Sequence, residues 1–308
     1  MTPFDRRDGW IWLDGALRPW REARLHVLSH GLHYASAVFE GERAYGGRVF
    51  RLANHGRRLV RSAEIVDLGL PHTAARLDEA VLETLEANGL TEAYVRRVAW
   101  RGSEQMSVAA RQAKVHVAIA AWDWPGDPVA ARHGLSLTWA PYRRPPPDSL
   151  PWQAKAAGLY MVNTLSKHDA EAAGHDDAML LGWRGYIAEA TGANVFFLRG
   201  RQLHTPVPDC FLDGITRQTV ILLARARGLE VFERQIKPAE IARFEGCFLT
   251  GSAAEILPVT ALGAQRFAIP EPLRRLMADY AELVRETEAA PGEITPEGAG
   301  VGAIRPSA

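Results

Sequence analysis

One interrupted stretch in the second half of the chain decides how it folds. It begins Glu189-Ala190-Thr191-Gly192-Ala193-Asn194-Val195-Phe196, continues through Leu203-His204-Thr205 and ends Leu212-Asp213-Gly214-Ile215-Thr216-Arg217. Its apolar runs, broken by a glycine at Gly200, predict that residues 194–198 pair with residues 202–205 as strands. A helical pattern follows from Thr216 to Arg227 and stops at Gly228. The stretch therefore predicts strands that lead into the N-terminus of a helix.

The start of that helix is a candidate anion site. Gly214, Ile215 and Thr216 place free backbone N–H groups and the positive end of the helix dipole together, which favours a phosphate. Gly251-Ser252 follows a predicted strand over residues 246–250 and adds N–H groups and a hydroxyl. Arg58, in a predicted helix of the first half, can add a full charge, although a solvated arginine is the ordinary alternative.

Lysine is scarce in this chain, so the candidates for a reactive amine are few. The four lysines are Lys114, Lys155, Lys167 and Lys237. Lys155 lies in Gln153-Ala154-Lys155-Ala156-Ala157-Gly158, between a proline-rich loop at residues 145–147 and a predicted helix. Most lysines are solvated, but small neighbours leave room here for a cofactor ring. We therefore expect Lys155 to be the reactive lysine, if the chain has one.

The stretch from Glu189 to Arg217 resembles, in its elements and in their spacing, the signature of class IV aminotransferases, which are fold type IV pyridoxal-phosphate enzymes. The resemblance runs from about Trp10 to Val259. It implies an α/β protein of two α+β domains, similar to D-amino-acid aminotransferase, with pyridoxal 5′-phosphate as cofactor. It also implies a homodimer, in which a loop of a second subunit completes each active site between the domains.

The resemblance also implies roles for single residues. Lys155 would be the catalytic lysine that binds the cofactor covalently, and Glu189 would pair with the pyridine nitrogen. Tyr160 would hydrogen-bond the ring 3′-oxygen. The cofactor phosphate would be bound by Arg58, Ile215, Thr216, Gly251 and Ser252.

The first half of the chain resembles the branched-chain members of this family. The resemblance lies in Ser29-His30-Gly31-Leu32-His33-Tyr34-Ala35-Ser36-Ala37-Val38-Phe39-Glu40-Gly41 and in Ala93-Tyr94-Val95-Arg96. It implies transamination of L-leucine, L-isoleucine and L-valine with 2-oxoglutarate. Arg96, on the same strand face as Tyr94, would meet the distal carboxylate of glutamate. The expected substrate residues are Tyr34, Phe39, Gly41, Tyr94, Arg96, Trp124, Ser252 and Ala253.

Two segments depart from the branched-chain pattern, and they leave alternatives open. Trp124 is followed by Pro125-Gly126-Asp127 rather than by an aromatic residue, and residues 102–111 lack the glycine-rich form common in the family. An (R)-selective amine transaminase or a D-amino-acid transaminase of the same family is the first alternative. A cofactor-binding homologue without catalytic activity is the second. His26, His30 and His33 have no carboxylate that completes a metal site, so no metal is expected.

The pattern predicts a small domain over residues 1–124, a linker over 125–134, a large cofactor-binding domain over 135–287 and a poorly ordered tail over 288–308. Strands are expected at residues 10–13, 16–17, 48–52, 93–100, 114–122, 135–140, 178–183, 186–190, 194–198, 202–205, 229–235 and 246–250. Helices are expected at residues 55–68, 76–87, 159–173 and 216–227.

The composition excludes several classes of protein. The formal net charge is zero over 308 residues and no block of like charge occurs, so neither nucleic acid nor a membrane surface is an expected partner. Apolar residues make up 47% of the chain, enough for a substantial core. The polar residues 1–10 do not form a signal peptide, and no apolar run is long enough to span a bilayer. Cys210 and Cys247 are expected to be reduced thiols in a cytoplasmic protein that acts on small amino acids and 2-oxo acids.

Overall fold

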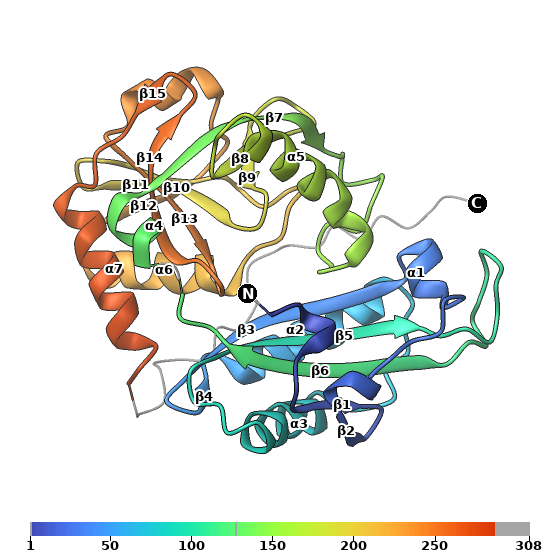
Figure 1. Cartoon of the computed structure of the whole chain (residues 1–308). Helices are drawn as coiled ribbons and strands as arrows, with labels where there is room; N and C mark the ends of the chain where they lie inside the picture. The colour runs from blue at the N-terminus through green and yellow to red at the C-terminus, as the bar shows by residue number, and fades with distance from the viewer. Residues whose placement is uncertain (1, 127, 287–308) are drawn as a thin grey trace.

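A computed structural model describes residues 2–126 and 128–286, and these residues build two sheets that lie one above the other in Figure 1. The first sheet has six strands in the order β2-β1-β6-β5-β3-β4. The second has nine strands: eight follow the order β12-β11-β10-β13-β14-β7-β8-β9, and β15 pairs with β14. A further pairing of β9 with β10 sets Glu189 opposite Asn194. The family's characteristic stretch therefore lies in the second sheet.

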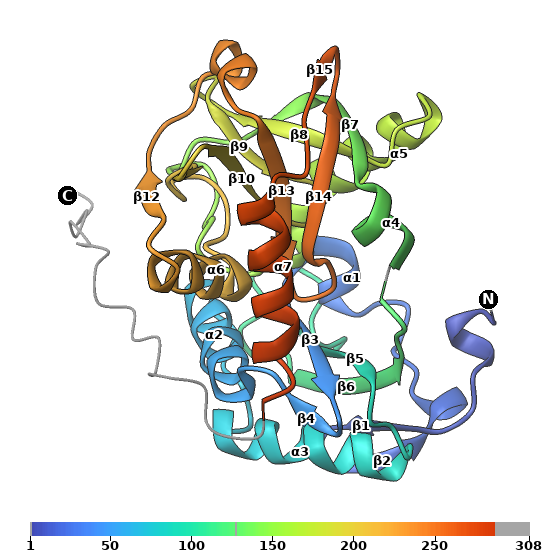
Figure 2. The ribbon, with the colours of Figure 1, turned by 90° about the vertical axis from the view of Figure 1, so that its left-hand side faces the viewer.

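The first sheet is antiparallel throughout and is covered on one face by two helices (Figure 2). The helices are α2 (Leu52–Ile65) and α3 (Ala74–Ala87). The strands are β1 (Trp10–Leu13), β2 (Ala16–Pro19), β3 (Ala37–Tyr45), β4 (Arg48–Val49), β5 (Ala93–Arg101) and β6 (Val115–Asp123). Short helices precede β3 at Phe4–Arg6, Trp20–Glu22 and His30–Tyr34, the last of which is α1.

Strand β3 presents different chemistry on its two faces. Val38 and Ala44 belong to the apolar core under α2 and α3. Because side chains alternate along a strand, Phe39 and Gly41 point to the other face, where their partners on β5 are Val98 and Arg96. The uncovered face of this sheet is therefore the one that carries four of the expected substrate residues: Phe39, Gly41, Tyr94 and Arg96.

The second sheet mixes parallel and antiparallel pairs. Its strands are β7 (Leu135–Arg144), β8 (Asp177–Gly182), β9 (Ile187–Ala190), β10 (Asn194–Arg199), β11 (Gln202–Thr205), β12 (Glu230–Glu233), β13 (Gly246–Gly251), β14 (Glu255–Leu262) and β15 (Gln265–Arg266). Helices α6 (Ile215–Ala226) and α7 (Glu271–Leu283) bury Val220 and Leu273 against Phe196 and Phe248 of the sheet. The remaining helices are α4 (Pro128–His133), α5 (Met161–Ala172) and the 3₁₀ turns at Ala157–Tyr160 and Pro238–Arg243.

Several expectations from the sequence were wrong. The strand expected at residues 48–52 ends at Val49, because only two residues pair with β3; Arg51 then turns the chain at φ 56°, and Leu52 begins α2. The expected linker over residues 125–134 contains the short helix α4, which no pattern in the sequence predicted. The sequence interpretation also missed β3, β14, α1 and α7. The expected tail at residues 288–308 lies outside the described residues.

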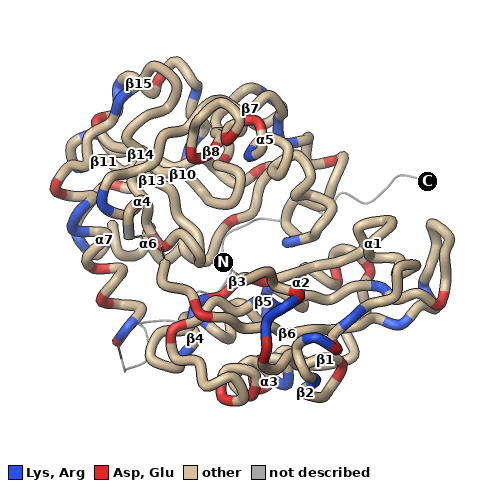
Figure 3. The backbone as a smooth tube through the Cα atoms, in the orientation of Figure 1, with Lys and Arg blue, Asp and Glu red and all other residues tan. Residues whose placement is uncertain are grey.

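Positions occupied by lysine or arginine and positions occupied by aspartate or glutamate are spread along both sheets and their helices, as the coloured backbone of Figure 3 shows. This agrees with the formal net charge of zero. Within the described residues, no helix has the length and apolar character needed to cross a membrane.

Candidate active site

A cavity of about 100 Å³ lies between the two sheets and collects polar groups from both. The first sheet and its covering helix contribute lining residues from β3, β5 and α2. The rest of the lining comes from the segment that contains Lys155 and Tyr160, from β9, β10 and β13, and from the start of α6. The residues expected in a site that also line this cavity are Gly41, Arg58, Tyr94, Lys155, Tyr160, Glu189, Ile215, Thr216, Gly251, Ser252 and Ala253.

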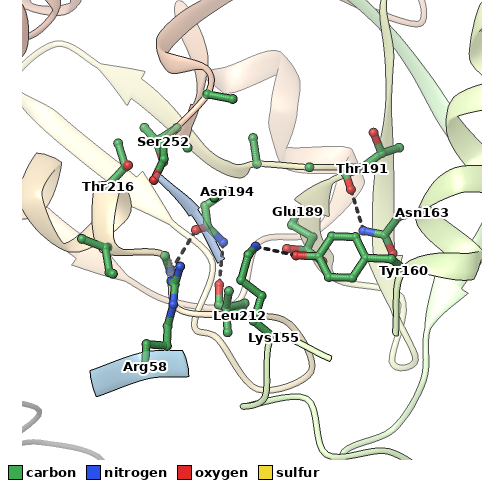
Figure 4. A pocket seen from close by; sticks show the side chains of 18 of the residues that line it. Arg58, Lys155, Tyr160, Asn163, Glu189, Thr191, Asn194, Leu212, Thr216 and Ser252 are labelled. Carbon is green, nitrogen blue, oxygen red and sulfur yellow. Dashed lines mark hydrogen bonds between the residues drawn. The ribbon is translucent and has the colours of Figure 1, made fainter. Parts of the chain in front are cut away.

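The polar groups of this cavity fall into two sets around Lys155, as Figure 4 shows. Arg58, Thr216 and Ser252 lie on one side of the lysine. Glu189 and Tyr160 lie on the other side, together with Asn163 and Thr191. One side therefore offers donors for an anion, and the other offers a carboxylate and a phenol.

Lys155 is fixed through its backbone by the first sheet, although it follows that sheet in sequence. Its carbonyl accepts a hydrogen bond from the Phe39 N–H at 3.0 Å, and its own N–H donates to Ser62 Oγ of α2 at 3.0 Å. Its amine is thus free to reach into the cavity, where Nζ donates to the Tyr160 hydroxyl at 2.8 Å. Both residues contact the Phe39 ring.

Glu189 is a buried carboxyl group whose negative charge is only partly balanced by neighbouring cations and hydrogen-bond donors. Its nearest cation is Arg144, with Nε at 3.4 Å from Oε1. Burial raises the pKa of Glu189 to about 7, while the charges of Arg144 and Lys155 and a hydrogen bond with Asn163 lower it. The site therefore suits a ligand that brings a positive charge or a proton to this carboxylate.

This raised pKa predicts how the cofactor-free protein responds to pH. The folded protein retains a proton on Glu189 that the unfolded chain loses near its ordinary pKa of 4.5. Stability should therefore fall between pH 4.5 and 7, by about 3 kcal/mol in total. Glu189→Gln cannot ionise, so its gain over the parent should be small at pH 5 and approach ~3 kcal/mol at pH 8.

Urea unfolding of both cofactor-free proteins at the two pH values measures this difference. Glu64→Gln, at an exposed position of α2, is the control and should show little change at either pH. An equal gain for Glu189→Gln at pH 5 and pH 8 would contradict the assignment of the raised pKa to this carboxyl.

The anion side is built around the N-terminus of α6. Its N-cap residue is Gly214, which has no side chain to cap the helix, so the first N–H groups are available to a ligand. Asn194 fixes the preceding loop: its Oδ1 accepts from the Gly214 N–H at 3.1 Å, and its Nδ2 donates to the Leu212 carbonyl at 2.9 Å. A Cβ on Gly214 would lie 2.3 Å from Asn194 Oδ1, so any other residue there would displace this asparagine.

The loop after β13 brings the other donors. Gly251, Ser252 and Ala253 line the cavity beside Thr250, whose buried hydroxyl has no hydrogen-bond partner within the described residues. An unpartnered buried hydroxyl is costly, and a polar ligand in the cavity would satisfy it. Glu255 then turns the chain at φ 54° and accepts a hydrogen bond from the hydroxyl of Tyr45 on β3 at 2.7 Å. The first sheet thus holds this loop in place.

Two of the expected substrate residues form a close contact. A Cβ on Gly41 would come within 1.9 Å of the Tyr94 hydroxyl, so the absence of a side chain makes room for the tyrosine. The Tyr94 hydroxyl in turn accepts from Arg96 Nη2 at 3.4 Å, which confirms that the two side chains share a face.

The other expected substrate residues lie around the cavity rather than in its lining. Phe39 contacts Tyr160, with 4.8 Å between ring centroids, and Trp124 packs on Tyr94 at 5.4 Å. Arg96 lies over the Phe39 ring and lines a neighbouring apolar cavity. Tyr34 packs on His30 and is half exposed, so this chain alone does not bring it to the cavity.

Several cavity or supporting residues were missed from the sequence. Thr191 and Asn194 lie inside the quoted stretch, in the turn after β9 and at the start of β10, and their polar side chains were a signal that could have been used. Asn163 donates to the Thr191 carbonyl at 2.7 Å from helix α5, and it accepts from Arg144 at 3.0 Å. Nothing local marks Asn163 or Arg144, because their role depends on β7 and α5 lying side by side.

The profile of the Amino-transferase class IV family matches residues 37–262, most of the chain. The chain belongs to this family. A protein of Rickettsia felis, named a probable branched-chain-amino-acid aminotransferase, is 40% identical over 280 residues, which are 90% of this chain and 96% of the relative.

Solved structures of branched-chain aminotransferases have the same fold. The branched-chain aminotransferase of Thermoproteus uzoniensis, solved with norvaline, superposes with a TM-score of 0.87 at 35% identity and covers 91% of this chain and 97% of its own. The branched-chain amino acid aminotransferase of Thermobaculum terrenum, solved in its PLP-bound holo-form, gives 0.84 at 28% identity, with 91% and 95% covered. The expected α/β fold of type IV is therefore confirmed.

The cavity fits the pyridoxal 5′-phosphate that class IV aminotransferases use. An amine lies at its centre, a buried carboxyl with a raised pKa lies on one side, and uncapped helix N–H groups with an arginine lie on the other. An aldehyde, a ring nitrogen and a phosphate of one cofactor would meet these three groups in that order.

Proposed function

We propose that this class IV aminotransferase transfers the amino group of L-leucine, L-isoleucine or L-valine to 2-oxoglutarate. The products would be the branched 2-oxo acid and L-glutamate. The observation that supports this most strongly is Arg96 beside the Gly41–Tyr94 contact, next to an apolar cavity. An apolar wall with one arginine suits a hydrocarbon side chain in one half-reaction and a distal carboxylate in the other.

The cofactor would be held at three points. Arg58, the start of α6 at Ile215 and Thr216, and the loop at Gly251 and Ser252 would bind its phosphate. Glu189 would hold the proton on the pyridine nitrogen, and Tyr160 would donate to or accept from the 3′-oxygen. When bound, pyridoxal phosphate supplies an aldehyde that takes up the amino group and a ring that withdraws electrons from the substrate Cα.

Lys155 would carry the proton in each half-reaction. Its Nζ would take the proton from Cα of the amino acid in the first half-reaction, and it would give a proton to Cα of the 2-oxo acid in the second. The hydroxyl of Tyr160, 2.8 Å from Nζ, restrains the amine at the centre of the cavity. The N–H groups of Ser252 and Ala253 and the Tyr94 hydroxyl would bind the α-carboxylate of the substrate, while Phe39, Trp124 and Tyr34 would supply apolar contacts.

A panel of amino donors tests this assignment. The holoenzyme is mixed with L-leucine, L-isoleucine, L-valine, D-alanine or (R)-1-phenylethylamine, and the visible absorbance of the cofactor and the formation of glutamate from 2-oxoglutarate are followed. Bleaching and turnover with the three L-amino acids are expected. Turnover confined to D-alanine or to the amine would replace the proposal by a D-amino-acid or (R)-amine transaminase, and bleaching by none of them would support an inert binding protein.

A homodimer is also part of the proposal, and the uncovered face of the first sheet supports it. This face holds an apolar cavity of about 360 Å³ lined by Arg96, Val98 and Trp100. Leu32 lines the same cavity and is 63% exposed, and Leu25 is 52% exposed. Exposed apolar surface of this extent, next to the active site, is typical of a subunit interface.

We therefore expect Leu32→Asp to produce monomers. Light scattering during gel filtration should give about twice 33.9 kDa for the parent chain and about 33.9 kDa for the variant. Leu82→Asp is a matched control, because Leu82 is 45% exposed on helix α3 at the covered side of the sheet. A dimer that survives Leu32→Asp, or dissociates equally with Leu82→Asp, would contradict this choice of interface.

The state of the cysteines supports a reducing location. Cys210 and Cys247 are free and buried, and burial raises the pKa of the Cys210 thiol to about 12. We propose that the enzyme acts in the cytoplasm, where such thiols stay reduced.

A further inference from the structure

A fully buried carboxylate on the covered face of β3 lies directly behind the active site. Glu40 stands between Phe39 and Gly41 in sequence but points the opposite way, toward α2. Its Oε1 accepts from Arg58 Nε at 2.7 Å and its Oε2 accepts from Arg58 Nη2 at 2.7 Å. Oε2 also interacts with His55 Nδ1 at 2.7 Å. A group so placed cannot touch a ligand, but it contacts a residue that lines the cavity.

The geometry of this pair determines which edge of Arg58 faces the cavity. A guanidinium group has two edges that can bind two acceptors each, and Glu40 occupies the Nε/Nη2 edge. Nη1 has no hydrogen-bond partner within the described part of the chain, and Arg58 lines the cavity. The Nη1/Nη2 edge is therefore available for two parallel bonds to phosphate oxygens.

The charge of Glu40 persists at any working pH. Burial alone would raise the pKa of this carboxyl, but the charge of Arg58 and the hydrogen bonds from Arg58 and His55 hold it well below its ordinary value of 4.5. The Glu40–Arg58 pair therefore remains ionic, and the orientation of the Arg58 guanidinium group remains fixed.

The same face of α2 also holds the catalytic segment. His55, Arg58 and Ser62 are spaced so that they lie on one side of the helix. Ser62 accepts from the Lys155 N–H, and the Phe39 N–H donates to the Lys155 carbonyl. Glu40 thus joins β3 to helix α2, which carries both Arg58 and the Ser62 hydroxyl that binds the Lys155 backbone.

We propose that Glu40 is a positioning residue for cofactor binding, which presents the free edge of Arg58 to the cofactor phosphate. This inference rests on the proposed role of Arg58 in binding that phosphate. Glu40 acts through Arg58 and does not contact the cofactor. Its removal should therefore weaken the recognition of the phosphate specifically, rather than the recognition of the ring.

The chain offers a closely matched control two residues away. Glu42 is also fully buried on the same face of β3, and it accepts from Arg97 Nε at 2.6 Å and from Nη2 at 2.8 Å. Arg97 donates in addition to Asp78, and none of these three residues lines the cavity. Glu42→Gln therefore disrupts an equivalent buried pair without changing the edge of Arg58 that faces the cavity.

The test compares two ligands that differ by the phosphate. Cofactor-depleted parent, Glu40→Gln, Glu42→Gln and Arg58→Ala proteins are titrated with pyridoxal 5′-phosphate and with pyridoxal, and the ratio of the two Kd values is measured by absorbance. We expect the preference for the phosphorylated ligand to fall at least tenfold in Glu40→Gln and to change less than twofold in Glu42→Gln. In an Arg58→Ala background, Glu40→Gln should have no further effect on the ratio.

Each result has a defined meaning. An unchanged ratio in Glu40→Gln, or an equal fall in Glu42→Gln, overturns the role of Glu40, provided that Arg58→Ala does lower the ratio. An unchanged ratio in Arg58→Ala removes the phosphate role of Arg58 itself, and the inference with it. If Glu40→Gln does not fold, Glu40→Asp keeps the charge with a shorter reach, and its ratio should lie below that of the parent.

Discussion

Lys155→Ala should abolish turnover and leave the fold intact. The substitution removes the amine that would bind the cofactor and carry the proton between Cα and C4′, so we expect kcat to fall by at least about 10⁴-fold. The fold should survive because the backbone of residue 155 keeps its bonds to Phe39 and Ser62, and only the Nζ bond to Tyr160 is lost. One such bond is worth about 1 kcal/mol.

Steady-state transamination of L-leucine measures the activity, and thermal unfolding measures the fold. Lys167→Ala is the matched control, because Lys167 lies on α5 and forms an exposed pair with Glu171. The control should keep the parent's kcat. A Lys155→Ala protein with more than a few per cent of the parent's turnover would overturn the assignment of the catalytic lysine.

Glu189→Gln should lower kcat by about 10²–10³-fold while the fold is retained. A neutral amide cannot stabilise a proton on the pyridine nitrogen, so the ring would withdraw fewer electrons when the Cα proton leaves. The KM for L-leucine should change little, since Glu189 lies on the other side of Lys155 from Ser252, which is part of the expected carboxylate site (Figure 4). This separation of kcat from KM distinguishes loss of ring activation from loss of substrate binding.

Glu189→Asp supplies the control for charge. It keeps a carboxylate with a reach shorter by one methylene, so its kcat should lie between those of the parent and Glu189→Gln. A stopped-flow measurement of the first half-reaction isolates the step from product release. If Glu189→Gln reacts within threefold of the parent rate, the carboxyl does not act on the ring.

The sequence predicted those parts of the site that lie within one local segment. The start of α6 was expected because Gly214 and the helical pattern after it are adjacent, and the N-terminus is indeed open to the cavity. Lys155 was expected because few lysines compete with it and its neighbours are small, and its amine does reach the cavity. Both expectations depended on resemblance as well as on local chemistry, and the roles of these residues stay predictions.

The parts that were missed depend on contacts between distant segments. Strand β3 begins within the stretch quoted for its resemblance, and Glu40 and Glu42 within it broke the apolar pattern of a buried strand. Only the pairing with Arg58 and Arg97 makes two buried acids acceptable there. Likewise, whether Tyr34 contacts the substrate depends on the proposed second subunit, which a single chain does not contain.

The attachment of Lys155 to β3 has a consequence for recombination between relatives. A crossover placed in the segment between β6 and β7 looks harmless, because it divides the chain between its two sheets. It would nevertheless pair the Lys155 segment of one parent with the Phe39 strand and the Ser62 helix of the other. Chimeras of this kind inherit Lys155 from one ancestor and its backbone support from another, so their success depends on how similar the parents are at residues 38–41 and 62.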